Sequence, residues 1–299
     1  MASEQYEQFR KVLKPGLAVA EDPTPLVREK MHAVHPTQWP KDVEEERVEI
    51  AGVPCAWVWT PEVGDSDRVV LLVHGGAFVS TYLEHYIGYA ATQSRYTRAR
   101  FLIPEYSLAP EARFPSQLEQ IVAVYRAVIK QGIAPQRIAF MGDSCGGGMA
   151  VAALCKLRDG GQPLPAAYAG LTPWFDALQE GDSAVNPRGF DPFANAPWVR
   201  ARFRDYVGEG GDLSDPLVSP LRADLKGLPP MYLAVGQIDT TSDDSTRLGA
   251  RAARVGVDVI LDVAGEMIHG FHGLATLFPE ANAGCERVGA FVQRQIPDD

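Results

Sequence analysis

The sequence lacks several features that would place it in a specialised class of protein. Its apolar runs, such as Val69–Val73, are far shorter than a membrane span, and residues 1–10 contain no apolar signal-peptide core. Lys and Arg total 28 against 38 Asp and Glu, and a net charge of −10 disfavours nucleic acid or an anionic membrane surface as partner. The four cysteines show no paired spacing, which favours reduced thiols. We therefore expect a cytoplasmic protein without a membrane partner.

What the chain does contain is typical of an ordinary soluble globule. Its 299 residues are 46% hydrophobic and 22% charged, which suits one large α/β domain or a core with an appendage. After an initial hairpin, apolar runs of strand length alternate with helical patterns, which predicts a mostly parallel α/β sheet. The expected strands are Val48–Ile50, Ala56–Thr60, Arg68–Val73, Ala99–Pro104, Arg137–Met141, Ala167–Leu171, Met231–Val235 and Val257–Val263.

Two segments do not follow this alternation. Residues 1–44 are polar and proline-dotted, with helical pieces expected at Tyr6–Leu13 and Pro25–Val34. Residues 175–215 are rich in Gly, Pro and Asp, with one helix expected at Trp198–Tyr206. We interpret the first as an appendage and the second as an insertion into a core of residues 45–299.

The motif with the clearest chemical meaning is Gly142-Asp143-Ser144-Cys145-Gly146. It lies between a predicted strand and a small-residue helix, Gly147–Leu157, and G-x-S-x-G in that setting forms a sharp turn that exposes the serine hydroxyl. The helix N-terminus just after it offers N–H groups to a developing negative charge. The motif predicts a nucleophile at Ser144.

A serine nucleophile needs a base, and the base needs an orienting carboxylate. Asp239 follows the predicted strand Met231–Val235, and His269 follows Val257–Val263. The order nucleophile, acid, base is that of α/β-hydrolases. Taken singly, the aspartate could be a helix cap and the histidine a core residue, but together they predict the acid and the base.

At this point the chain resembles the bacterial hormone-sensitive-lipase family of α/β-hydrolases. The resemblance rests on these stretches: His74-Gly75-Gly76-Ala77-Phe78, Tyr106-Ser107-Leu108-Ala109-Pro110-Glu111, the motif around Ser144, Asp239 with Asp243, and His269-Gly270-Phe271. It implies the α/β-hydrolase fold, with a mostly parallel eight-stranded sheet and a helical cap built from residues 1–44 and 175–215. It also implies esters with short to medium acyl chains as substrates, and no cofactor.

The resemblance further implies an oxyanion hole made by the backbone N–H groups of Gly75, Gly76 and Cys145. This agrees with the need for close approach of the main chain to the developing charge. The acyl pocket is expected to be lined by Phe78, Trp174 and Phe271, although core packing would account for each aromatic residue equally well. A metal site is not expected, because the pairs His269/His272 and His32/His35 lack a third ligand.

These observations predict a serine carboxylesterase working through an acyl-enzyme on a small-molecule ester. A lactone hydrolase would use the same residues on a cyclic ester. The alternative from another class is a non-catalytic receptor for a small molecule, since the gibberellin receptor shares this scaffold but lacks the base that His269 supplies here. Whether the last strand or helix forms a homodimer is left open.

Overall fold

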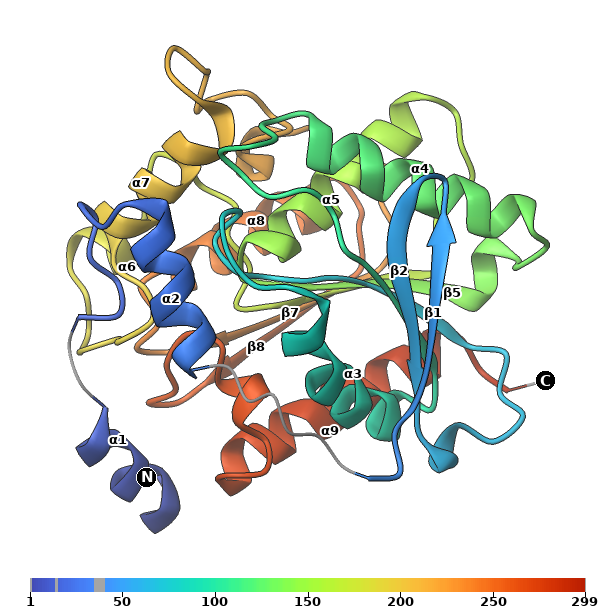
Figure 1. The fold of residues 1–299 in the computed structure, drawn as a ribbon, viewed down its shortest axis with the longest axis horizontal. Helices are drawn as coiled ribbons and strands as arrows, with labels where there is room; N and C mark the ends of the chain where they lie inside the picture. Colours follow the sequence, from blue (N-terminus) through green and yellow to red (C-terminus); the bar gives the residue numbers. More distant parts are fainter. Residues whose placement is uncertain (1, 14–15, 35–40, 299) are drawn as a thin grey trace.

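The structure, a computed structural model, describes residues 2–13, 16–34 and 41–298. One sheet of eight strands, in the order β1-β2-β4-β3-β5-β6-β7-β8, runs through the molecule (Figure 1). β1 and β2 form an antiparallel hairpin, β2 pairs antiparallel with β4, and the strands from β4 to β8 are parallel. The predicted fold class is confirmed. The strands are β1 Glu44–Ile50, β2 Val53–Trp59, β3 Val69–Val73, β4 Arg100–Pro104, β5 Ile138–Asp143, β6 Ala167–Leu171, β7 Met231–Gly236 and β8 Val259–Ala264.

The first strand is longer than its apolar residues suggested. β1 begins at Glu44, and its three consecutive glutamates are exposed on the edge of the sheet, where charge discourages pairing with another chain. The hairpin turn uses Ala51 and Gly52, both at positive φ (54° and 76°), which matches the twist of the flanking strands. The turn fixes the register that pairs Ile50 with Val53.

Helices cover both faces of the sheet because its central strands are apolar on both. In β3, Val69, Leu71 and Val73 belong to the apolar cluster under α4, α5 and α8. The alternate residues Val70 and Leu72 belong to the cluster under α3 and α9 (Figure 1). This is the alternation of a strand buried on both sides. The helices are α3 Leu83–Thr97, α4 Ser116–Lys130, α5 Ser144–Asp159, α8 Ser242–Arg254 and α9 Pro279–Gln295.

The two segments that broke the alternation lie together at one end of the molecule. α2 (Thr24–Val34) lies beside α6 (Asp182–Val185) and α7 (Ala196–Val207) in Figure 1, and α1 (Glu4–Val12) lies further along the same side. Asn195 donates from its side chain to the carbonyl of Ala18 at 2.7 Å, and Arg202 to that of Asp22 at 3.3 Å. The N-terminal segment and the insertion are therefore joined directly to each other. In the described part of the chain, no helix combines the length and apolarity needed to cross a bilayer.

The junction of β5 and α5 has no intervening loop. β5 ends at Asp143 and α5 begins at Ser144, whereas the sequence predicted a helix only from Gly147. Ser144 itself adopts a φ of 53°, in the left-handed region that costs energy for a residue with a side chain. A Cβ on Gly146 would lie 2.1 Å from the carbonyl oxygen of Val73. Glycine at 146 therefore lets α5 press against the end of β3.

Replacing Gly146 by alanine should destabilise the protein, because the added methyl group would overlap a backbone carbonyl that cannot rotate away. We expect Gly146→Ala to lower the free energy of unfolding by about 3 kcal/mol, measured by urea denaturation. Gly265→Ala is the control, because a Cβ there meets nothing within 4 Å. Equal stability of the two variants would show that the junction is less tightly packed than described.

Candidate active site

The structure brings Ser144, His269 and Asp239 into one hydrogen-bonded chain. His269 Nε2 lies 3.0 Å from Ser144 Oγ, and His269 Nδ1 lies 3.0 Å from Asp239 Oδ2. The three residues follow β5, β7 and β8, whose carboxyl ends meet at the same edge of the parallel sheet. The distances are those required for a hydroxyl, a base that accepts its proton and a carboxylate that orients the base.

Asp239 is held in place by the residues that follow it. Its Oδ1 accepts the backbone N–H of Thr241 at 2.8 Å and the hydroxyl of Thr241 at 2.9 Å, which leaves Oδ2 for His269. The neighbouring carboxylates, Asp243 and Asp244, accept backbone N–H groups elsewhere in the fold. Asp239 is thus the carboxylate that faces the imidazole, and Thr241 orients it.

Burial and nearby carboxylates determine the protonation of the two histidines on this loop. Burial alone would lower the pKa of His269, but the carboxylates of Asp239, Asp191 and Asp143 together raise it above its usual 6.5. Burial lowers the pKa of His272 to about 3, so His272 is neutral at physiological pH. Among the described residues, neither ring nitrogen of His272 has a hydrogen-bond partner.

The loop after β3 lies beside Ser144, but one of its expected donors is already used. The backbone N–H of Gly75 donates to Asp143 Oδ1 at 3.0 Å and lies 2.8 Å from the hydroxyl of Tyr86. Tyr86 in turn donates to Asp143 Oδ2 at 2.7 Å. The expectation that Gly75 serves the oxyanion hole is therefore wrong, because its N–H binds within the protein. Gly76 and Ala77 are the residues of this loop that line the cavity.

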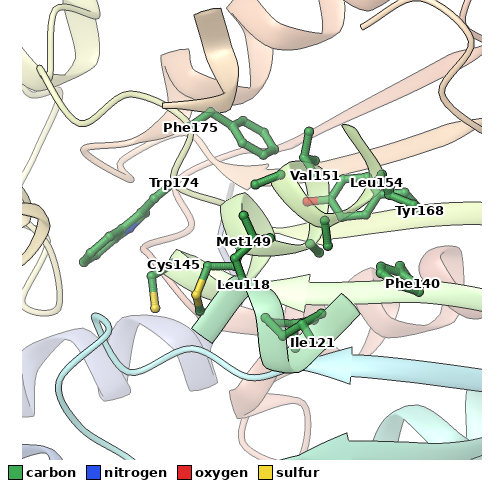
Figure 2. Packing of buried hydrophobic residues seen from close by; sticks show 14 of the residues in the cluster. Leu118, Ile121, Phe140, Cys145, Met149, Val151, Leu154, Tyr168, Trp174 and Phe175 are labelled. Carbon is green, nitrogen blue, oxygen red and sulfur yellow. The ribbon is translucent and has the colours of Figure 1, made fainter. Parts of the chain in front are cut away.

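Cys145 follows Ser144 and is completely buried. Its Sγ accepts the backbone N–H of Phe78 at 3.2 Å, and burial raises the pKa of the thiol to about 12. Figure 2 shows its side chain at the edge of the apolar cluster formed by α4, α5 and β5. The side chain is therefore uncharged, and it links the junction of β5 and α5 to the loop after β3. The backbone N–H of Cys145 belongs to the first turn of α5, where the helix provides no acceptor.

A cavity of about 290 Å³ opens onto Ser144 and His269. It is lined mainly by apolar side chains from the N-terminal segment, from the insertion and from the rest of the chain. They include Met31, Trp174, Phe193, Trp198 and Leu274. Of the three aromatic residues predicted to line the acyl pocket, Trp174 lines this cavity, and in Figure 2 it extends away from the cluster around α5.

The other two predicted lining residues pack in the core instead. The ring of Phe78 stacks on Tyr206, with the ring centroids 4.1 Å apart. Phe271 is fully buried in a separate cluster with Tyr6 and Met267. Neither Phe78 nor Phe271 contributes to the cavity wall, so this part of the prediction is wrong. A sequence pattern shows that an aromatic residue is buried but not on which side of the loop it packs.

The α/β-hydrolase fold family matches residues 70–273, well over half of the chain. The chain belongs to this family. An acetyl-hydrolase of Streptomyces hygroscopicus is 34% identical over 239 residues, which are 80% of each chain. A solved esterase of the bacterial hormone-sensitive-lipase family is 35% identical with a TM-score of 0.91 over 99% of both chains. A solved esterase/lipase from an uncultured bacterium is 33% identical with a TM-score of 0.93, over 99% of this chain and 100% of that one.

The resemblance to the hormone-sensitive-lipase branch of the α/β-hydrolases is thereby confirmed. It extends beyond the motifs, which span residues 70 to 271, to almost the whole chain. The N-terminal segment and the insertion, which carry no motif, lie largely within the length that the solved esterases cover.

Sequence reasoning about this hydrolase missed three residues of the site. Asp143 stands before Ser144 in the serine motif, and the sequence predicted no role for it, yet it accepts the N–H of Gly75, and burial raises its pKa to about 6. Met31 lines the cavity from α2, where the sequence predicted a helix but no site residue. Asp191, in the insertion, contacts the His269 loop. No sequence signal distinguished it from the other aspartates of that segment.

The histidine pairs His32/His35 and His269/His272 can be compared with the structure only in part. His35 lies outside the described residues, and His32 Nδ1 lies 2.9 Å from His85 Nε2. His269 is bound to Ser144 and Asp239. Over the described ranges, no group of three or more His, Cys, Asp or Glu side chains could hold a metal ion.

The two histidines of the site should titrate very differently in this hydrolase. Since the pKa of His269 is raised above 6.5, its imidazolium should persist to higher pH than a free histidine and lose its proton above that value. His272 should stay neutral down to about pH 4, because its pKa lies near 3. NMR titration of the ring protons, with His269→Gln and His272→Gln used for assignment, measures both. Titration of both rings near 6.5 would contradict the described burial.

Proposed function

We propose that this hydrolase is a serine carboxylesterase that acts through an acyl-enzyme. The observation that carries the proposal is the chain of two 3.0 Å contacts from Ser144 through His269 to Asp239, at the wall of a mainly apolar cavity. The esterases and acetyl-hydrolases among its relatives support carboxylic esters as the class of substrate.

In the first half of the reaction, Ser144 Oγ attacks the ester carbonyl carbon while His269 Nε2 takes the hydroxyl proton. The resulting imidazolium is stabilised by the carboxylate of Asp239, which holds Nδ1–H. Collapse of the tetrahedral intermediate breaks the bond to the alcohol oxygen, and that oxygen takes the proton from Nε2. The acyl group remains on Ser144 as an ester.

In the second half, water attacks the acyl carbon and gives its proton to His269 Nε2. Collapse of the second intermediate returns the proton to Ser144 Oγ and releases the carboxylic acid. In both halves the charge that develops on the carbonyl oxygen is stabilised by the N–H groups of Gly76 and Cys145. Gly75 is not in this set, because its N–H is bound to Asp143.

The substrates we propose are esters with short to medium acyl chains. A cavity of about 290 Å³ lies at the small end of the usual range for ligand pockets, about 300–1,000 Å³. Met31, Trp174 and Trp198 form an apolar wall, and α2 and α7 bring two of these residues from the cap. The cap segments, residues 1–44 and 175–215, therefore complete the binding site above a core that carries the reacting groups.

Removing the hydroxyl of Ser144 should abolish turnover without changing the fold. We expect Ser144→Ala to lower kcat by on the order of 10⁴, measured on p-nitrophenyl esters of increasing chain length and on a panel of lactones. Ser245→Ala, at a buried serine of α8 that does not line the cavity, is the control and should keep wild-type turnover. Activity of Ser144→Ala within tenfold of wild type would reject the nucleophile. Faster turnover of lactones than of any open-chain ester would reassign the substrate class.

Shortening a cap residue should change the chain length that is preferred. Met31→Ala enlarges the cavity, so we expect the optimum in kcat/KM to move to longer acyl chains. Val27→Ala is the matched control, because Val27 is buried in the same helix and does not line the cavity. It should lose stability, by roughly 1 kcal/mol, and keep the wild-type profile. Identical profiles for both variants would show that α2 only packs on the core.

A further inference from the structure

Asp191 of the insertion lies against the loop that carries His269. Its Oδ2 accepts the backbone N–H of His269 at 2.8 Å. Its Oδ1 accepts the N–H of Phe193 at 2.9 Å, which folds the insertion into a tight turn at this point. One carboxylate thus joins the cap to the residue proposed as base, over 78 positions of sequence.

The carboxylate is buried, with 7% of the residue exposed. The titratable groups that face it are Asp239 from the loop after β7, His269 from the loop after β8 and Tyr6 from α1. Burial first, and then the charge of Asp239, raise the pKa of Asp191 to about 7, against the opposing effect of His269. The carboxylate is therefore harder to ionise than that of a free aspartate, and the imidazolium form of His269 favours its ionised form.

We propose that Asp191 is a positioning residue for the reaction, which fixes the backbone of His269 through its Oδ2 and adds a second negative charge beside the imidazolium. Asp239 orients the ring from Nδ1, whereas Asp191 holds the main chain from which the ring projects. Since Asp191 belongs to the cap, a docked cap is part of the arrangement that keeps Nε2 within 3.0 Å of Ser144 Oγ. This inference rests on the proposed esterase function.

The chain contains a matched comparison for this residue. Asp215-Pro216-Leu217 repeats the pattern Asp191-Pro192-Phe193, and Asp215 Oδ1 accepts the N–H of Leu217 at 2.8 Å in the same kind of turn. The contact to the His269 loop is made by Asp191 and not by Asp215. A substitution at 215 therefore measures the cost of changing the turn alone.

The experiment compares Asp191→Asn, Asp191→Ala and Asp215→Asn in the full chain, with kcat and kcat/KM for p-nitrophenyl butyrate followed from pH 5 to 9. Asparagine keeps the size and one acceptor oxygen but removes the charge. Without that charge the imidazolium is less stable, so the acid limb of kcat/KM should move to lower pH by about half a unit or more. Turnover at the optimum should fall by about tenfold. The turnover of Asp191→Ala, which also loses the acceptor, should fall further, and the turnover of Asp215→Asn should match that of the wild type.

The outcomes separate the inference from the function on which it rests. If Asp191→Asn keeps the wild-type acid limb and turnover, or if Asp215→Asn shifts both equally, Asp191 has no positioning role. If turnover fell but the acid limb of kcat/KM stayed at the wild-type pH, the electrostatic part of the proposal would be rejected. Asp191 would then only stabilise the turn. Should Asp191→Ala fail to fold, the asparagine variant still decides the question. A wild-type protein that hydrolyses no ester would instead refute the proposed function.

Discussion

The close contact between the beginning of α5 and the end of β3 is the constraint on which the rest of the site depends. Gly146 lets the backbone of α5 approach the carbonyl oxygens of Val73 and His74, at distances that no side chain could tolerate. The same contact places Ser144 at the beginning of a helix and next to the loop that follows β3. The strained φ of Ser144 is held by this packing. The positions of the proposed nucleophile and of the Gly76 N–H are therefore set together.

Much of this arrangement could be predicted from the sequence, because it follows from local patterns. β3 is apolar throughout and β5 is apolar from Ile138 to Met141, which is the pattern of strands covered on both faces. A serine between close-packed glycines, followed later by an aspartate and a histidine after strands, is the pattern of a nucleophile with its acid and base. Both sets of observations depend on residues that lie near each other in the chain or at equivalent ends of parallel strands.

The parts that were missed depend on contacts between distant segments. Gly75 has the sequence context of an oxyanion donor, and only the position of Asp143 shows that its N–H is already bound. Asp191 and Asp215 have the same local sequence and the same turn, and they differ in what lies opposite the second oxygen. Phe271 follows His269 closely but belongs to an apolar cluster that also contains Tyr6 of the N-terminal segment. No property of the single chain segment distinguishes these cases.

The N-terminal segment and the insertion are separated in sequence by residues 45–174, yet they are hydrogen-bonded to each other. Asn195 and Arg202 of the second segment donate to the carbonyl groups of Ala18 and Asp22 in the first. The two segments consequently form one hydrogen-bonded unit. Exchanging the insertion for that of a relative, without its N-terminal segment, would remove the donors that bind the carbonyl groups of Ala18 and Asp22. A chimera of this chain with a relative would therefore keep these contacts only if both segments came from the same protein.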